Sequence, residues 1–208
     1  MILIANEFLD ALPVRQFEKD ADGWKERYVG VDEKSRFQFM LREPSDAPNA
    51  NLPPDVPAGT VFEWSPDIGS FVRSVASRLT EEPGAALFVD YGHRTSSAGE
   101  TLQAVRRHKY HPVLGEPGEA DLTAHVDFEE VSRVAKSAGA SVLGPIEQGL
   151  WLKRLGIAAR GALLTRGKTS ELAKEIETGI RRLTEPDAMG ALFKVLALTH
   201  PNLDKLEG

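Results

Sequence analysis

Hydrophobic and polar residues alternate along this chain with two different periods, and the pattern predicts strands interleaved with helices. The chain opens on an uninterrupted apolar run, residues 1–5, which is typical of a strand covered on both faces. A second buried-type run lies at 85–89. The segment between them predicts an amphipathic helix behind Ser65, a favourable N-cap residue. Its apolar face comprises Ile68, Val72, Val75, Ala76 and Leu79. This order makes a parallel crossover the simplest topology.

An antiparallel β excursion is expected before that helix. Segments 24–31 and 36–41 alternate in polarity around the polar turn 32–35, so we expect two or three strands within about 14–42. Five prolines then fall within 43–59, which predicts a loop or an extended linker because proline has no backbone N–H to donate. A surface connection is the favoured interpretation of this proline-rich loop, and a lid that contacts substrate is the alternative.

The second half of the chain continues the alternation of helices and strands. Asp127 and Glu130 form a variant of the capping box, which predicts a helix that Gly139 ends. A strand is expected at 140–146, a short helix at 149–157 and a last strand at 192–198. A longer helix is expected from residue 169 or 170 until Pro186.

The composition is that of a globular chain and argues against several classes of function. Hydrophobic residues make up 41% and charged residues 27% of the 208 residues. A formal charge of −6 argues against general affinity for nucleic acid, and the absence of cysteine excludes disulfides and thiolate catalysis. The first residues lack the pattern of a secretory signal, and no apolar run approaches the length of a membrane span. The cytoplasm is therefore the default compartment.

Common catalytic and cofactor-binding motifs do not occur in this sequence. It contains no Gly-x-Ser-x-Gly elbow, no His-Glu-x-x-His helix, no Walker A loop and no Gly-x-Gly-x-x-Gly loop. The five histidines are scattered singly, which gives little support to a metal site. Any nucleotide-type cofactor would have to bind through sequence that this chain lacks.

Polar residues instead follow the predicted buried strands, where open α/β sheets bind ligands. The candidate site residues are Asn6, Glu7, Asp10, Asp90, Tyr91, His93, Asp121, Thr123, His125 and Asp127. Several have a simpler structural explanation: Asp127 as a helix cap, His93 as a turn residue, and Asp10 as a residue that solvates the turn before Pro13. Glu7 is harder to explain in this way, because an unpaired charge at the end of a buried strand is costly.

Four segments of the chain carry a specific resemblance to a known family. Residues 5–14, 62–66, 86–93 and 120–128 resemble, in order, the signature blocks of the MidA family. This is the family of the mitochondrial complex I assembly methyltransferase and its bacterial relatives. The resemblance implies an α/β fold, the Rossmann-like sheet of class I S-adenosyl-L-methionine (SAM)-dependent methyltransferases. That sheet is mostly parallel, with seven strands of which the last is antiparallel.

The resemblance also implies a cofactor, a substrate class and a location. SAM would be the methyl donor, and a protein arginine the acceptor, with a respiratory complex I subunit as the target linked to mitochondrial members. The family's upstream half, with its glycine-rich cofactor loop, has no counterpart here. We therefore expect residues 1–208 to be the later, C-terminal part of the domain, supplying the substrate side of the site. A bacterial member would be cytoplasmic, and a eukaryotic one would lie in the mitochondrial matrix.

Roles for single residues follow from the same resemblance, partly by analogy with other protein arginine methyltransferases. Glu7 would hold the substrate guanidinium, and His125 or Asp127 would accept the released proton. Substrate-binding positions would be Asn6, Asp10, Tyr91 and His93. The rival hypothesis is a non-catalytic assembly-factor module that keeps the fold and binds a partner protein through the hairpin and the proline-rich loop.

Overall fold

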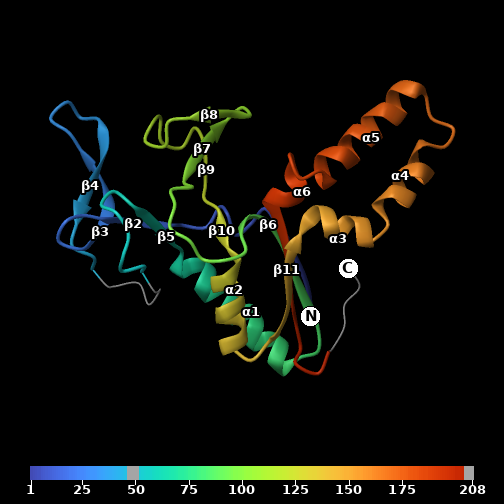
Figure 1. Ribbon diagram of the computed structural model, residues 1–208, viewed down its shortest axis with the longest axis horizontal. Coiled ribbons are helices and arrows are strands. Elements are labelled where there is room, and N and C mark those ends of the chain that lie inside the picture. Colours follow the sequence, from blue (N-terminus) through green and yellow to red (C-terminus); the bar gives the residue numbers. More distant parts are fainter. Residues whose placement is uncertain (46–51, 204–208) are drawn as a thin grey trace. The chain divides into compact units, whose positions relative to one another are not determined.

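The computed structural model describes residues 1–45 and 52–203, and the chain divides into two compact units (Figure 1). Unit 1 comprises Met1–Leu9, Phe71–Ser96 and the segment from Val126 onward. Unit 2 comprises Asp10–Ser70 and Ser97–His125. Each unit therefore assembles segments that are distant in the sequence, and each has its own sheet structure.

A mixed sheet forms the centre of unit 1. Its strands follow the order β1 (Ile2–Asn6), β6 (Ala85–His93), β12 (Phe193–Thr199) and β11 (Ser141–Glu147). Strand β1 is parallel to β6, whereas β12 is antiparallel to both of its neighbours. The two-residue strand β10 (Val126–Asp127) pairs in parallel with the end of β6. The predicted parallel crossover and the antiparallel last strand are both confirmed.

Two helices lie on one side of this sheet. Helix α1 (Pro66–Glu81) buries the predicted apolar residues Val72, Val75, Ala76 and Leu79, and helix α2 (Phe128–Ser137) packs on β6, β11 and β12. The predicted caps are also present. The Ile68 N–H donates to Ser65 Oγ at 3.2 Å, and Gly139, with φ of 92°, follows the end of α2.

Two short helices pack on the other side of the sheet. Helices α3 (Gln148–Arg154) and α6 (Met189–Leu192) carry Trp151 and Met189 onto a buried cluster of Val89, Phe193 and Val195. Helix α5 (Ser170–Thr184) begins at the predicted position, with Thr169 as its N-cap. Helix α4 (Ile157–Thr165), which the sequence pattern did not predict, packs against α5.

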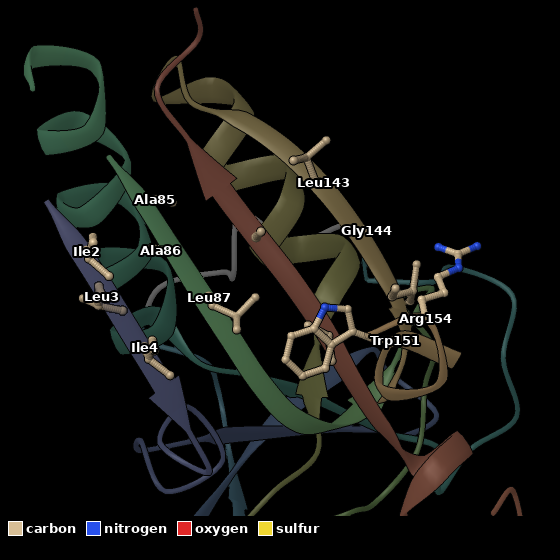
Figure 2. Close-up of a pocket in the computed structure, with 13 residues that line it drawn as sticks. Ile2, Leu3, Ile4, Ala85, Ala86, Leu87, Leu143, Gly144, Trp151 and Arg154 are labelled. Atoms are coloured by element: carbon tan, nitrogen blue, oxygen red, sulfur yellow. The ribbon is translucent and has the colours of Figure 1, made fainter. Parts of the chain in front are cut away.

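One prediction about β1 is wrong. Its apolar run indicates a strand covered on both faces, but Ile2 is 88% exposed and Ile4 is 72% exposed. Figure 2 shows these side chains on the side of the sheet opposite α1 and α2. They border an apolar groove of about 420 Å³, which also includes Leu87, Leu143 and Trp151. Within the described residues only one helical layer covers β1, so the side chains of Ile2 and Ile4 face solvent.

Unit 2 contains two antiparallel sheets. The first has the order β4 (Phe37–Arg42), β3 (Trp24–Val31), β2 (Arg15–Lys19) and β5 (Val61–Trp64). It confirms the predicted excursion and adds β5 as a fourth strand. The second, which was not predicted, joins β7 (Gln103–Arg106) to β8 (Lys109–His111) and β9 (Asp121–Thr123).

Residues 46–51 of the predicted proline-rich loop lie outside the described residues, and the rest of 43–59 forms neither helix nor strand. Among the helices that the structure describes, none combines the length and the apolar character needed to cross a membrane.

Candidate functional site

Five of the predicted site residues lie at the carboxyl-end rim of the unit 1 sheet. Asn6 ends β1 and Glu7 follows it, Tyr91 and His93 belong to the end of β6, and Asp127 ends β10. Because β1 and β10 both run parallel to β6, their carboxyl ends point the same way as the end of β6. We call these residues the rim site. Its location agrees with the general position of ligand sites in α/β sheets.

Glu7 is exposed, so the argument that singled it out from the sequence is wrong. We expected a charge buried at a strand end, but the structure places this side chain in solvent. Its backbone is unusual instead, with φ of 47° in the left-handed region that favours glycine. The Glu7 N–H donates to Val89 O at 3.0 Å, and Asn6 Nδ2 lies 3.4 Å from Glu7 Oε1. A strained, exposed carboxylate is typical of functional positions.

Asp90 holds the turn that carries Glu7. Only 1% of Asp90 is exposed, and its Oδ2 atom accepts hydrogen bonds from the N–H groups of Phe8 at 3.1 Å and Leu9 at 3.0 Å. Its Oδ1 atom accepts one from the Tyr91 N–H at 3.1 Å. The sequence pattern placed Asp90 among the polar residues after the apolar run 85–89, but it lies within β6, and its carboxylate faces inward and supports the backbone.

Asp127 is a helix cap, as its position in the sequence predicted. Its Oδ1 atom accepts the N–H groups of Glu129 at 3.0 Å and Glu130 at 3.1 Å. Its Oδ2 atom accepts from the Ser96 hydroxyl at 2.6 Å and lies 4.0 Å from His93 Nε2. Sequence reasoning missed Ser96, which stands in a polar loop with no motif around it.

Lys194 is a second residue that the sequence did not reveal. It lies directly opposite Asp90 in the pairing of β12 with β6, and it is only 8% exposed. Burial lowers the pKa of its ammonium group, and the nearby Glu147 carboxylate partly opposes that shift. Its Nζ atom donates to the backbone oxygens of Ala191 and Leu192. Tyr91, beside it along the rim, packs edge-on against Phe193 with ring centroids 5.4 Å apart.

Unit 2 contains the remaining four candidate residues, which are Asp10, Asp121, Thr123 and His125. Asp10 is 6% exposed, so the alternative that it only solvates the turn before Pro13 is wrong. Its backbone oxygen accepts the Ala124 N–H at 3.0 Å, and the next residue, His125, donates its N–H to Thr101 Oγ1 at 2.8 Å. The Asp10 backbone therefore contacts the residue that directly precedes His125.

The fold is that of a class I SAM-dependent methyltransferase. Residues 1–146 match the family described as "Putative S-adenosyl-L-methionine-dependent methyltransferase", and the chain belongs to this family. The sequence is similar to the proteins named "Protein arginine methyltransferase NDUFAF7, mitochondrial". It is 37% identical to the rat protein over 198 residues and 36% identical to the human protein over 198 residues. The resemblance to the MidA family is thereby confirmed.

Each of these alignments covers 94% of this chain but only 45% of the rat protein and 44% of the human protein. The chain thus spans about half the length of the curated relatives that it matches.

Two crystal structures of proteins from Burkholderia thailandensis share the fold. One, described as uncharacterized, superposes with a TM-score of 0.89 at 32% identity and covers 99% of this chain and 56% of that protein. The other is described as a "likely methyl transferase" bound to S-adenosyl-homocysteine, with a TM-score of 0.87 at 32% identity, covering 99% of this chain and 55% of that protein. The predicted class I methyltransferase fold is confirmed.

Proposed function

We propose that this chain is the substrate-side part of a SAM-dependent protein arginine methyltransferase. The observation that carries the proposal is its membership of a methyltransferase family over residues 1–146, together with an acidic rim at the carboxyl ends of parallel strands. SAM would supply the methyl group. The name shared by the mitochondrial relatives supports a protein arginine as the acceptor.

The chemistry explains why such a site needs an exposed carboxylate. A guanidino nitrogen attacks the sulfonium methyl, the S–C bond breaks as the N–C bond forms, and a proton later leaves the methylated nitrogen. Orientation supplies much of the rate enhancement in a transfer of this kind. Glu7, exposed on a turn that Asp90 holds in place, is suited to bind the guanidinium and fix its orientation.

The hydrogen bonds of Asp127 support His125 as the proton acceptor. Asp127 Oδ1 is occupied by two backbone N–H groups, and Oδ2 accepts from Ser96. Both oxygens of this carboxylate are therefore already occupied by donors, whereas a general base must have an atom available to take the substrate proton. Histidine is the residue type that most often exchanges protons near neutral pH, which makes His125 better suited to accept the substrate proton. Asn6, Asp10, Tyr91 and His93 remain proposed substrate-binding residues.

We also propose a substrate protein and a cellular compartment. A net charge of −6 is suited to a basic polypeptide segment, and a respiratory complex I subunit is our proposed target. The compartment would be the mitochondrial matrix for a eukaryotic protein and the cytoplasm for a bacterial one. The relatives' names support the first of these locations.

The first experiment is a calorimetric titration with S-adenosyl-homocysteine. It compares the 208-residue chain with a version extended upstream in frame. We expect binding by the longer version, because this chain lacks a glycine-rich cofactor loop. Transfer of a labelled methyl group to a complex I subunit is then measured in the longer version. The Glu7→Gln variant should lose at least about tenfold in kcat/KM, which corresponds to about 1.4 kcal/mol.

The control for this variant is Asp187→Asn, which removes one exposed carboxylate elsewhere in unit 1. It should methylate at the wild-type rate. Full activity of Glu7→Gln would refute the role of Glu7, whereas no cofactor binding by either version would refute the methyltransferase function.

One observation favours the rival function, a non-catalytic protein-binding module. The β3–β4 hairpin exposes five apolar side chains on one face. They are Val29, Val31, Phe37, Phe39 and Leu41. Exposed apolar patches of this kind mark interaction surfaces. Binding of a complex I subunit that persists without SAM and is lost in Phe39→Ser would support this module. A Phe39→Ser variant that binds like the wild type would count against it.

A further inference from the structure

A chain of hydrogen bonds in unit 2 connects β5 to the backbone of His125. Glu63 Oε1 accepts from Gln16 Nε2 at 2.8 Å, from the Thr101 N–H at 3.1 Å and from the Leu102 N–H at 3.0 Å. Glu63 Oε2 accepts from the Thr101 hydroxyl. The same hydroxyl oxygen accepts the His125 N–H at 2.8 Å. The Glu63 carboxylate therefore determines the orientation of the group that holds His125.

The residue types that form this series of hydrogen bonds suit its geometry. Four donors converge on Glu63, and only an ionised carboxylate offers enough acceptor positions without a donor of its own. Thr101 is suited to the central position in this series of hydrogen bonds, because its hydroxyl donates to Glu63 and presents its lone pairs to the His125 N–H. Valine has nearly the shape of threonine but can do neither, whereas serine can do both.

Neighbouring contacts hold the same loop on the first sheet of unit 2. The Gly99 N–H donates to Val61 O at 2.8 Å, and Glu100 Oε1 pairs with Arg27 Nη1 at 2.6 Å. Arg27 is itself bound by Glu18 at 2.7 Å. Residues 99–102 are thus attached to strands β3 and β5 at successive positions. Thr101 is part of a rigid support and not of a freely moving loop.

We propose that Glu63 and Thr101 are positioning residues that fix the backbone of His125, so that its imidazole meets the substrate nitrogen in one orientation. This proposal rests on the proposed function, in which His125 accepts the proton. Neither residue is assigned a contact with the reacting atoms. Their effect is on the geometry of the base, where displacements of about 1 Å can cost about a hundredfold in rate.

The test compares Thr101→Val with Thr101→Ser in the upstream-extended version of the chain. Amide hydrogen exchange at His125 reports the hydrogen bond without reference to catalysis. We expect exchange to be at least about tenfold faster in Thr101→Val than in the wild type, with Thr101→Ser close to the wild type. The amide of Phe17, which lies in the buried part of β2, should be unchanged in both variants and shows that unit 2 stays folded.

Methylation kinetics provide the second measurement. Thr101→Val should lower kcat about tenfold or more and leave KM within about twofold, because substrate binding does not depend on the orientation of the base. Thr101→Ser should restore kcat. Glu63→Gln keeps an acceptor for the three N–H donors and reverses only the bond with the hydroxyl, so its loss should be smaller.

Two results would overturn the positioning role. The first is unchanged exchange at His125 in Thr101→Val. The second is faster exchange with an unchanged kcat. Failure of the proposed function would give a third result, which differs from these two. The wild type would then show slow exchange at His125 and transfer no methyl group, which would leave the hydrogen bonds in place but refute their catalytic purpose.

Discussion

Asp90 Oδ2 accepts a hydrogen bond of 3.0 Å from the backbone N–H of Leu9, and this contact holds the turn after β1 against the end of β6. The other oxygen of Asp90 accepts the Tyr91 N–H, so both ends of the carboxylate face donors. In Asp90→Asn, the amide nitrogen must face a backbone N–H at one end. We expect a loss of about 1–3 kcal/mol in the free energy of unfolding, measured with urea. Asp187→Asn should change it by less than about 0.5 kcal/mol. Equal stability of the two variants would contradict this role.

Gly92 permits the close pairing of β6 with β10. A Cβ atom added there would lie 2.0 Å from Val126 O and 2.8 Å from Val126 N, so β10 would have to move. We expect Gly92→Ala to lower the free energy of unfolding by about 1–3 kcal/mol and to displace Asp127 from His93. The matched control is Gly179→Ala in α5, where open space surrounds the added methyl group. It should stabilise the chain by up to about 1 kcal/mol. Thermal unfolding of both variants decides between these outcomes.

The capping and catalytic roles of Asp127 can be separated by substitution. Asparagine is as good an N-cap as aspartate but is not a base, whereas alanine removes both functions. We expect Asp127→Ala to lower the free energy of unfolding by about 0.5–2 kcal/mol, and Asp127→Asn to keep nearly wild-type stability and methylation. If Asp127→Asn were stable but inactive in the upstream-extended protein, Asp127 and not His125 would be the proton acceptor.

The Arg15–Glu26 pair makes the stability of unit 2 depend on pH. Arg15 Nε and Nη2 donate to the two Glu26 oxygens at 2.6 and 2.8 Å, and this pairing holds the pKa of Glu26 below its ordinary value of 4.5. A carboxyl pKa that is lower in the folded state than in the unfolded state stabilises the fold above the unfolded pKa. The contribution disappears as pH falls through the folded pKa.

We therefore expect Glu26→Gln to be less stable than the wild type at pH 7 by about 1–3 kcal/mol. The difference should shrink as pH falls below 4.5 and through the lower pKa of the folded state, because the wild-type carboxyl then also becomes neutral. Urea unfolding at pH 7 and pH 3 measures it. Glu33→Gln, an exposed residue in the β3–β4 turn, should show little difference at either pH. A Glu26→Gln difference that is the same at both pH values would exclude this ion pair as the source.

Local patterns were enough to predict most of the elements. Apolar runs and helical spacing predicted β1, α1, β6 and α2, and the capping roles of Ser65 and Asp127 follow from rules that span only three residues. The antiparallel last strand came from the family resemblance, because no local pattern specifies the direction of a distant strand. Helix α4 and strands β7 to β9 were missed, since short segments with mixed polarity carry a weak periodic signal.

The order of most strands and helices, the caps and the polar residues that follow the strands could be predicted from the sequence alone, because each depends on residues close together in the chain. The family could be recognised because its signature blocks occur in the same order along the sequence. The tertiary structure decided what those polar residues do. Glu7 is exposed on a strained turn, Asp90 faces inward to support it, and Thr101 holds His125 from 24 positions away. Such contacts depend on strand register and long-range packing, and an apolar pattern indicates only that a residue tends to be buried, not which residue will lie beside it.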